Sequence, residues 1–297
     1  MSFCTDVKNE LNACWPKTPC CKVSEAYGLM LFGTAFSLQR ICLQTEHPET
    51  ARRYASLLRK TFHTECRIAQ KQKITRVAVA GPGERLKLMT ALGQGLDPEL
   101  KLHRELFQCE HCRAAFIRGA FLSCGQVSDP GKEYHLEFVA GSETAAFGLL
   151  QLLRELGFDP KLIDRGSGFV VYLKDSENVE DLLTYMGAPG AALQVMDVKI
   201  VKTVRNKANR ITNCENANIG KTVSASVAQL TAIERLEQAG RLSGLSPELQ
   251  ETAAARREHP DLALSELAAL LGVSRSGVNH RLKKLTELAA EEKDSLS

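Results

Sequence analysis

The chain has 297 residues, 44% of them hydrophobic and 25% charged, which suits two globular domains and excludes a disordered or fibrous chain. Its net charge is only +3, and no stretch approaches the roughly 18 consecutive apolar residues of a membrane-spanning helix. The first residues include Asp6 and Glu10 and no apolar core, unlike a secretory signal peptide, so we expect a cytoplasmic protein whose ten cysteines are reduced thiols.

The first part of the chain contains an internal repeat. Two segments rich in small and aromatic residues, 25–36 and 114–125, each predict a helix with a glycine in the middle. Gly28 and Gly119 correspond at an offset of 91 residues. Because glycine allows the closest approach of two helices, we expect these helices to pack against each other.

Each of these helices is followed by strand-like sequence, a second helix and a further strand. The strand-like segments are 40–47 and 74–81 in the first copy and 132–141 and 168–175 in the second, and the second helices are 49–62 and 143–158. Each copy therefore reads α-β-β-α-β-β-α. The two copies, at about 24–105 and 112–200, would stack around a pseudo-two-fold axis in an α+β domain that we assign to residues 1–208.

The strand-like segment 132–141 alternates between two faces. The apolar face carries Tyr134, Leu136 and Phe138, and the polar face carries Glu133, His135 and Glu137. We expect the polar face to point outward, where its carboxylates would repel DNA phosphate.

The two glycine-containing helices are similar to the motif helices of LAGLIDADG homing endonucleases, in which acidic residues at the helix ends hold Mg²⁺ for DNA cleavage. Here those positions are Gly33 and Cys124, and the earlier acidic positions are Leu31 and Leu122. Mg²⁺ takes oxygen ligands, so none of these residues offers a suitable side chain. We therefore predict a degenerate motif with no catalytic residue and no cofactor.

A CxxC pair, Cys109 and Cys112, raises the question of a metal site, with His103 and His111 nearby. A structural zinc site usually shows a second pair at a defined spacing, and the only other close pair, Cys20–Cys21, is adjacent in sequence. Free, partly buried thiols are the expected state, and we assign no metal site.

A basic stretch follows the repeats. Residues 199–225 hold six Lys and Arg against one Glu, whereas residues 1–198 hold 23 residues of each sign and residues 226–297 hold nine basic and eleven acidic residues. We assign 209–226 as a basic linker, which either contacts a polyanion or is simply solvated.

Three linker residues, Arg210, Asn213 and Lys221, are candidate contacts with DNA or with the other domain. The alternative for the asparagines is structural: Asn213, Asn216 and Asn218 would cap the helix that enters the next domain. The sequence does not separate these two roles.

From residue 227 onward the pattern is helical, and we predict an all-α helix-turn-helix domain over 227–297. Segment 262–285 carries its two characteristic helices. Apolar residues at helical spacing form their buried faces: Leu264, Leu267, Ala268 and Leu271, then Val278, Leu282 and Leu285. Between them Gly272 permits the turn and Ser274 is placed to cap the second helix.

The exposed face of that second helix carries the side chains that DNA reading requires. Arginine can bridge guanine, asparagine can bridge adenine, and lysine neutralises phosphate. The candidate DNA-binding residues are Ser274, Arg275, Ser276, Asn279, His280, Arg281, Lys283 and Lys284. A helical hairpin with a solvated basic face is the alternative, but the core, turn and basic face together favour DNA binding.

Together these motifs resemble the WhiA family of bacterial sporulation and cell-division regulators over essentially the whole chain. The strings that carry the resemblance are NRITNCENANIGKTVSAS (209–226), ARREHPDLALSELAALLGVSRSGVNHRLKKL (255–285) and AFIRGAFLSCGQVSDPGKEYHLEF (115–138). The chain departs from the family at Cys124 and Gln126, where the family tends to carry small residues.

The resemblance implies a degenerate LAGLIDADG domain joined to a helix-turn-helix domain similar to region 4 of sigma factors. It also implies a cytoplasmic, nucleoid-associated protein that binds double-stranded DNA and is linked to cell division and chromosome segregation, with transcription regulation in some lineages. RNA polymerase or a partner regulator is a candidate partner, a membrane is not, and the oligomeric state stays open.

The expected function is thus a non-catalytic DNA-binding regulator. Two alternatives from other classes remain at this point. One is an active LAGLIDADG-type homing endonuclease, and the other is a protein-interaction module whose DNA binding is vestigial.

Overall fold

The structure is a computed structural model that describes residues 2–94 and 100–295, and the chain divides into two compact units, residues 1–203 and 204–297. Residues 95–99 of the predicted first repeat and residues 296–297 of the predicted last domain lie outside the described part. In the first unit an N-terminal helix, α1 (Phe3–Ala13), precedes two copies of the order α-β-β-α-β-β-α, as the repeat predicts.

The elements of the two copies match one for one. The first copy comprises α2 (Pro19–Leu31), β1 (Ala35–Phe36), β2 (Ile41–Thr45), α3 (Pro48–Phe62), β3 (Cys66–Lys71), β4 (Ile74–Val79) and α4 (Pro82–Ala91). The second comprises α5 (His111–Cys124), β5 (Gly125–Val127), β6 (Leu136–Ala140), α6 (Glu143–Glu155), β7 (Lys161–Asp164), β8 (Phe169–Leu173) and α7 (Ser176–Met186), and a short 3-10 helix, η1 (Arg104–Leu106), lies between the copies. Each copy forms an antiparallel four-stranded sheet, in the orders β1-β2-β4-β3 and β5-β6-β8-β7.

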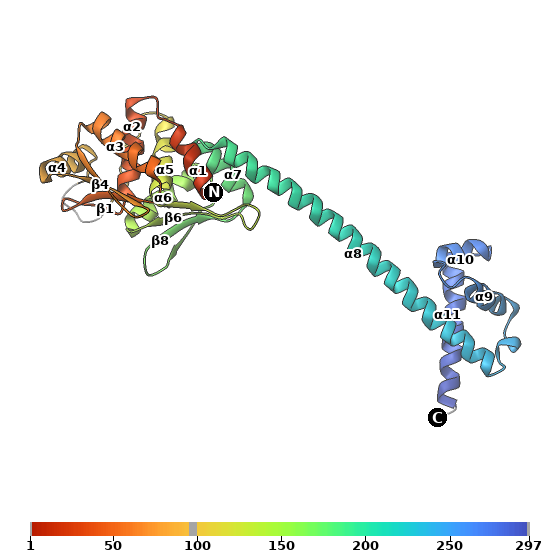
Figure 1. Cartoon of the computed structure of the whole chain (residues 1–297). Helices are drawn as coiled ribbons and strands as arrows, with labels where there is room; N and C mark the ends of the chain where they lie inside the picture. Colours follow the sequence, from red (N-terminus) through yellow and green to blue (C-terminus); the bar gives the residue numbers. More distant parts are fainter. Residues whose placement is uncertain (1, 95–99, 296–297) are drawn as a thin grey trace. The chain divides into compact units, whose positions relative to one another are not determined.

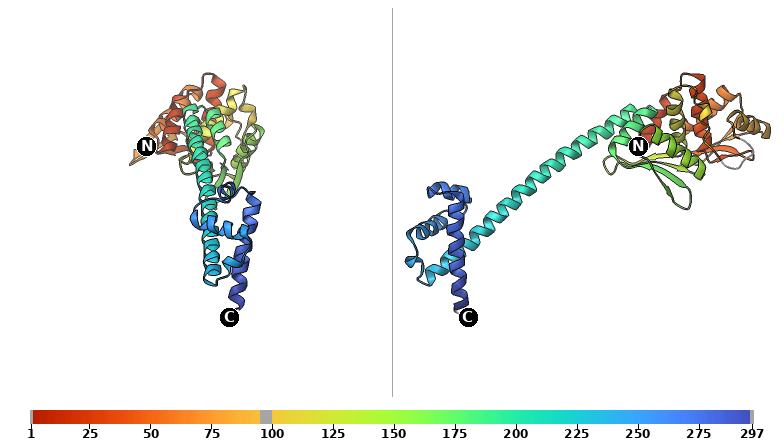
Figure 2. Two further views of the ribbon diagram at one scale, coloured as in Figure 1. Left: turned by 90° about the vertical axis from the view of Figure 1, so that its right-hand side faces the viewer. Right: turned by 180° about the vertical axis from the view of Figure 1, so that it is seen from behind.

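The helices of this unit cover one face of both sheets (Figure 1, Figure 2). Alternate residues of the central strands point toward the helices, so Leu43 and Val77 of the first sheet and Phe138 and Val171 of the second are buried. These side chains join those of α2, α3, α5 and α6 in one continuous apolar core. The two copies therefore share a single core.

The first motif helix differs from its predicted limits, residues 25–36. It begins earlier, at Pro19, and ends at Leu31, so residues 32–36 are not helical. The N–H groups of Phe32 and Gly33 close its last turn on carbonyls of that turn. The Thr34 hydroxyl then accepts a hydrogen bond from the Gln44 N–H (2.9 Å), and this contact holds the segment that leads into β1 next to β2.

The four central strands β2, β4, β6 and β8 fall inside the predicted segments, whereas β1, β3, β5 and β7 belong to the predicted order but lie outside the segments assigned to strands. Strands β1 and β5 have only two and three residues, too few for an alternating pattern. Strands β3 and β7 lie at the sheet edges and have little or no buried side-chain surface, so their sequences lack a hydrophobic face.

The second unit is helical. Helix α8 (Pro189–Gln238) runs through the boundary between the units and is followed by a 3-10 helix, η2 (Leu242–Gly244), and by α9 (Pro247–Glu258), α10 (Leu264–Leu270) and α11 (Arg275–Ser295). The core of this unit includes Ile233 and Leu236 of α8, packed with residues of α9, α10 and α11. No helix in the described ranges is both long enough and apolar enough to span a bilayer.

The predicted basic linker, residues 209–226, lies inside α8 and is helical throughout. Asn213, Asn216 and Asn218 are interior positions of this helix, so they do not cap its start. The capping alternative is therefore wrong. Residues 209–226 contain no proline, the residue that most strongly interrupts a helix, so the helix can continue through them.

Candidate nucleic-acid interface

Helices α2 and α5 cross at the centre of the first unit, and their glycines define the crossing. A Cβ atom built on Gly28 would overlap the carbonyl oxygen of Phe116, and one built on Gly119 would overlap the carbonyl oxygen of Glu25. Both contacts are with backbone, which cannot move aside as a flexible side chain can. Phe116 and Glu25 are themselves 91 residues apart, so the two contacts obey the internal repeat.

The degenerate positions lie at the C-terminal ends of these helices. Gly33 comes two residues after the end of α2, and Cys124 is the last residue of α5. Burial raises the pKa of Cys124 to about 12, so its thiol stays protonated near neutral pH. Leu31 and Leu122 are buried in the apolar core. None of the four positions presents an oxygen ligand for Mg²⁺ from its side chain.

Neighbouring side chains occupy this end of the helix pair. The Ser123 hydroxyl of α5 donates to the carbonyl oxygens of Leu29 (3.2 Å) and Phe32 (2.8 Å) at the end of α2. Lys8 of α1 lies with its amine 5.9 Å from the ring centre of Phe121, and burial lowers the pKa of this lysine. The C-terminal ends of α2 and α5, which would hold metal in a nuclease, are here joined by the Ser123 hydroxyl, and Lys8 of α1 packs against α5 beside them.

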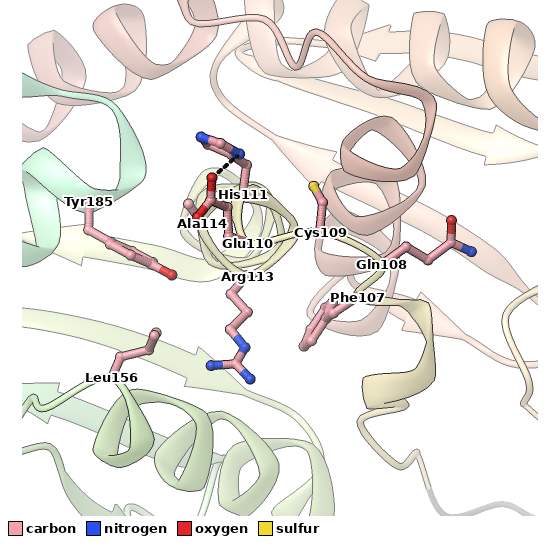
Figure 3. Close-up of a pocket in the computed structure, with 9 residues that line it drawn as sticks. All are labelled: Phe107, Gln108, Cys109, Glu110, His111, Arg113, Ala114, Leu156 and Tyr185. Carbon is pink, nitrogen blue, oxygen red and sulfur yellow. Dashed lines mark ion pairs between the residues drawn. The ribbon is translucent and has the colours of Figure 1, made fainter.

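A pocket of about 770 Å³ opens near the other end of α5 (Figure 3). Its charged or titratable lining residues include Glu110, His111, Arg113 and Tyr185. Helix α5 rises about 1.5 Å per residue, so roughly 20 Å of helix separates this pocket from Cys124. The pocket is therefore separate from the degenerate nuclease positions.

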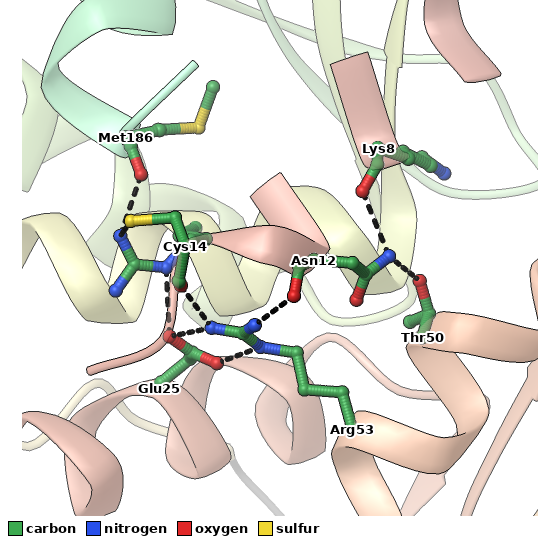
Figure 4. Close-up of polar contacts among 8 residues, drawn as sticks. Lys8, Asn12, Cys14, Glu25, Thr50, Arg53 and Met186 are labelled. Carbon is green, nitrogen blue, oxygen red and sulfur yellow. Dashed lines mark hydrogen bonds and ion pairs between the residues drawn. The ribbon is translucent and has the colours of Figure 1, made fainter. Parts of the chain in front are cut away.

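A buried carboxylate joins the two copies (Figure 4). Glu25 of α2 forms ion pairs with Arg53 of α3 and with Arg118 of α5, at 2.8 Å in the second case. Arg118 also donates to the carbonyl oxygen of Met186 (2.7 Å), and Arg53 donates to that of Asn12 (2.8 Å). All three ionic side chains are almost fully buried. The network stabilises the interface between the copies, and no spacing pattern in the sequence indicates it.

The two sheets differ in the charge on the face turned away from the helices. In the first sheet the register places Arg67 and Lys71 of β3 and Arg76 of β4 on this face, because β4 turns its alternate residues, Val77 and Val79, inward. All three basic side chains are exposed. This face presents positive charge to solvent.

In the second sheet Glu137 lies on the side opposite Phe138, as the alternation predicts. However, it is 9% exposed, and its carboxylate contacts Arg165 and His135, each at 3.0 Å. Glu137 therefore lies on the predicted side of the sheet, but its charge is paired with Arg165 and is not free to repel phosphate as expected. The loop between β7 and β8 supplies Arg165, a contact between distant segments that strand alternation alone cannot reveal.

The predicted helix-turn-helix is formed by α10, a short turn and α11. Gly272 has a φ of 64°, the left-handed conformation that a sharp turn needs. The Ser274 hydroxyl accepts a hydrogen bond from the Gly277 N–H (3.1 Å), which caps α11. Leu267 and Ala268 of α10 and Val278, Leu282 and Leu285 of α11 are buried. Turn, cap and core all agree with the sequence prediction.

The predicted DNA-reading residues share one surface of α11. Seven are exposed, namely Ser274, Arg275, Ser276, Asn279, His280, Lys283 and Lys284, and Arg281 is half-buried. Arg281 donates to the hydroxyl of Thr252 in α9 (3.5 Å), and Lys283 contacts Glu287 one turn further on (3.6 Å). Arg275 and Asn279, near the helix start, stand four residues apart and so lie on the same face.

A buried arginine that no sequence pattern indicates supports this unit from within. Arg256 of α9 is 2% exposed, and its guanidinium donates to the carbonyl oxygen of Leu262 (2.7 Å), just before α10 begins. Burial lowers the pKa of Arg256. Ser226 of α8 donates to the carbonyl oxygen of Pro260 (2.6 Å) in the same loop. These contacts fix the loop that orients α10.

The three candidate linker contacts are exposed residues of α8 within the second unit. Arg210, Asn213 and Lys221 are three and eight residues apart, which brings them to roughly one side of a helix. They form a polar surface on α8, whereas the predicted DNA-reading residues lie on α11.

Comparisons with protein families and relatives agree with these features. A model of the WhiA LAGLIDADG-like domain matches residues 113–205, and a model of the WhiA C-terminal helix-turn-helix domain matches residues 208–289. The chain is 36% identical to a probable cell division protein WhiA of Alkaliphilus oremlandii, over 98% of each chain. It is 35% identical to the protein of the same description from Staphylococcus aureus, over 97% of this chain and 96% of the relative.

Solved structures extend the likeness to the fold. The crystal structure of full-length DUF199/WhiA from Thermatoga maritima covers 98% of this chain and 99% of its own length, with a TM-score of 0.61 and 21% identity. The structure of an N-terminal LAGLIDADG domain of DUF199/WhiA covers 63% of this chain and 92% of its own, with a TM-score of 0.50 and 19% identity. The fold is therefore a LAGLIDADG-like α+β domain followed by a helical region.

Proposed function

Because the chain belongs to the WhiA family, we propose that it is a non-catalytic DNA-binding regulator of cell division that reads double-stranded DNA with its C-terminal helix-turn-helix. The curated relatives carry the description of probable cell division proteins, which supports the process. Within this process we propose two specific roles, transcription regulation of the sporulation type and a part in chromosome segregation.

The observation that carries the proposal is the surface of α11. Its first turns present Arg275, Ser276 and Asn279 to solvent from a helix whose opposite side is locked into the core. A helix of this kind fits the major groove, where arginine can bridge guanine and asparagine can bridge adenine. Lys283 and Lys284 follow Asn279 about one turn further along the helix and suit phosphate contacts.

The α+β unit is proposed to serve as a platform for a partner or for weak DNA contact, without cleaving DNA. The side chains at Gly33 and Cys124 offer no oxygen ligand at the ends of the motif helices, which speaks against the endonuclease alternative. The basic outer face at Arg67, Lys71 and Arg76 suits weak contact with phosphate. Arg210, Asn213 and Lys221 of α8 are proposed as additional, sequence-independent contacts.

We further propose that the protein works in the cytoplasm in association with the nucleoid. A single recognition helix makes few base contacts, so RNA polymerase or a partner regulator is the proposed source of additional affinity. The chemistry of the site fits duplex DNA. Each phosphate contact contributes about −0.9 to the slope of log affinity against log salt. A salt-dependent affinity for duplex DNA would therefore distinguish functional DNA binding from the vestigial DNA binding of a protein-interaction module.

The test begins with selection of sites from a random-sequence DNA duplex library by the full-length protein. Binding of the selected duplex is then measured by fluorescence anisotropy for wild type, for Arg275→Ala/Asn279→Ala, and for Lys87→Ala as a control on an exposed lysine of α4. We expect the double variant to lose sequence preference while the control binds as wild type. Equal affinity of all three proteins would refute the proposal.

A supercoiled plasmid incubated with the protein and Mg²⁺ or Mn²⁺ separates regulator from nuclease. We expect no nicked or linear product. Cleavage that is lost on mutation of the motif helices, and that persists through repeated purification, would establish the endonuclease alternative instead.

A further inference from the structure

Four cysteine sulfurs converge at the N-terminal ends of the two motif helices. Cys20 and Cys21 lie in the first turn of α2, and Cys109 and Cys112 bracket the start of α5. The four Sγ atoms all lie within 4.8 Å of one another. Cys20 and Cys21 are adjacent in sequence and so do not show the usual spacing of a metal-binding pair, but the crossing of α2 and α5 brings the two pairs together.

The spacing of these sulfurs matches a single tetrahedral ion. Zinc–thiolate bonds of about 2.3 Å in tetrahedral geometry set the sulfurs about 3.8 Å apart. Cys109 Sγ lies 3.6 Å from Cys20 Sγ, 3.5 Å from Cys21 Sγ and 3.5 Å from Cys112 Sγ, and Cys21 Sγ lies 4.0 Å from Cys112 Sγ. A [4Fe–4S] cluster, which binds each of its four cysteines to a different iron, needs a wider spacing of the sulfurs than this.

The surroundings of the sulfurs are those of a structural rather than a catalytic site. Cys21 and Cys112 are buried, and Cys20 and Cys109 are partly buried beside Phe107 and Ala115. With four protein ligands of one kind, no coordination position remains for water or substrate. Cys109 also lines the pocket at the start of α5 (Figure 3), so an ion or a chelator can approach the site from solvent.

Hydroxyl groups hold the ligand-bearing segments in place. The Ser24 hydroxyl lies 3.0 Å from the carbonyl oxygen of Cys20 and 3.4 Å from that of Leu106, and so connects α2 to the segment that leads to Cys109. Thr18 caps α2 and lies 3.3 Å from Cys20 Sγ. Such outer contacts orient metal ligands and tune their basicity.

We propose that Cys20, Cys21, Cys109 and Cys112 bind one Zn²⁺ ion as a tetrathiolate site that clamps the N-terminal ends of the two motif helices. Soft thiolates in tetrahedral geometry select zinc among common divalent ions. The ion closes a chain segment of nearly 90 residues and ties the two copies together at the end of the helix pair opposite Gly33 and Cys124. Binding releases the thiol protons, because cysteine coordinates as thiolate.

The site follows the internal repeat in part. Cys21 and Cys112 are 91 residues apart, the same offset as Gly28 and Gly119, so they occupy equivalent places on the two motif helices. Cys20 and Cys109 complete the set without being equivalent.

The first experiment measures metal in the full-length protein, purified without added chelator, by plasma mass spectrometry. We expect about one Zn²⁺ per chain. Cys109→Ser/Cys112→Ser should lose the zinc, whereas Cys66→Ser and Cys214→Ser, which alter a half-exposed and an exposed cysteine elsewhere, should keep it. Zinc retained by the double variant, or iron in place of zinc in the wild type, would overturn the proposal.

A measurement on the wild type alone guards against a variant that does not fold. Zinc K-edge X-ray absorption should report four sulfur neighbours at about 2.3 Å. Replacement of zinc by Co²⁺ should give the visible absorption of tetrahedral cobalt thiolate. Mixed sulfur and oxygen or nitrogen neighbours, or a disulfide between these cysteines in the freshly purified reduced protein, would show that the cluster is not a tetrathiolate zinc site.

Discussion

Gly28 and Gly119 are equivalent residues of the two motif helices, and each lies directly against the backbone of the other helix. The close approach accompanies the burial of residues 24–31 of α2 and 115–122 of α5, including Tyr27 and Phe116, whose rings lie 5.3 Å apart. The crossing is therefore the point at which the two copies depend most on small side chains.

Replacement of Gly119 by alanine should destabilise the first unit by about 3 kcal/mol, because the added methyl group overlaps the carbonyl oxygen of Glu25. Trp15 is the chain's single tryptophan and lies in this unit, so its fluorescence during urea unfolding reports the change. Gly220→Ala is the control, since an added Cβ there meets nothing within 4 Å in helix α8. An unchanged Trp15 transition in Gly119→Ala would contradict the packing.

Removal of the Glu25 charge should destabilise the same unit by about 3 kcal/mol, because Glu25→Gln leaves the Arg53 and Arg118 guanidinium groups buried without a counter-charge. Glu49→Gln breaks the exposed pair with Arg52 and should change stability by less than about 1 kcal/mol. Urea titration of both variants compares the two effects directly. Equal urea midpoints for the two variants would mean that the buried ion pairs of Glu25 contribute no more to stability than the exposed pair of Glu49.

Truncation of Arg256 should loosen the loop before α10. Arg256→Ala removes the donors to the Leu262 and Pro260 carbonyl oxygens and leaves a cavity, at a cost of about 3 kcal/mol. Arg257→Ala is matched in type and position, but it removes only the exposed pair with Glu237. Hydrogen exchange across residues 247–275 of the full chain should accelerate in the first variant and stay near wild type in the second.

The stability of the first unit should fall as the pH drops below neutrality. Burial, aided by the positive charge of Lys8, holds the pKa of His47 below its ordinary value, against an opposing effect of Glu46. The unfolded chain then binds a proton at higher pH than the folded chain, so the contribution of His47 is complete above about pH 6.5 and is lost as the pH falls through the folded pKa.

The test compares urea midpoints at pH 7.5 and pH 5.5, two values on either side of the ordinary histidine pKa of about 6.5. His47→Gln should reduce the difference between them, whereas His280→Gln, an exposed residue of the second unit, should leave it as in wild type. A larger difference between the two urea midpoints in His47→Gln than in wild type would contradict the predicted loss of stability on protonation of His47.

Elements with a strong periodic signal could be predicted from the sequence. The central strands β2, β4, β6 and β8, the helix-turn-helix core and the Ser274 cap follow from local patterns, and the offset between Gly28 and Gly119 reveals the two copies. The fold class follows from the same repeat, because two matching sets of elements imply two matching sheets.

Contacts between distant segments could not be predicted in this way. The pairing of Glu137 with Arg165, and of Glu25 with Arg118, depends on how whole elements pack, and neither pair leaves a spacing pattern along the chain. The cysteine cluster did leave one signal. Cys21 and Cys112 share the 91-residue offset of the glycines, so alignment of the two copies would have placed both thiols at one end of the helix pair.

The Glu25–Arg118 pair makes the two halves of the first unit obligate complements. Under the 91-residue offset Glu25 corresponds to Phe116, and Arg118 corresponds to Tyr27, so neither half carries both members. A homodimer of first halves would bury two carboxylates that each lack the second arginine, and a homodimer of second halves would bury two arginines facing no carboxylate. If the unit arose by gene duplication from a symmetric ancestor, this divergence at the axis made the fusion irreversible.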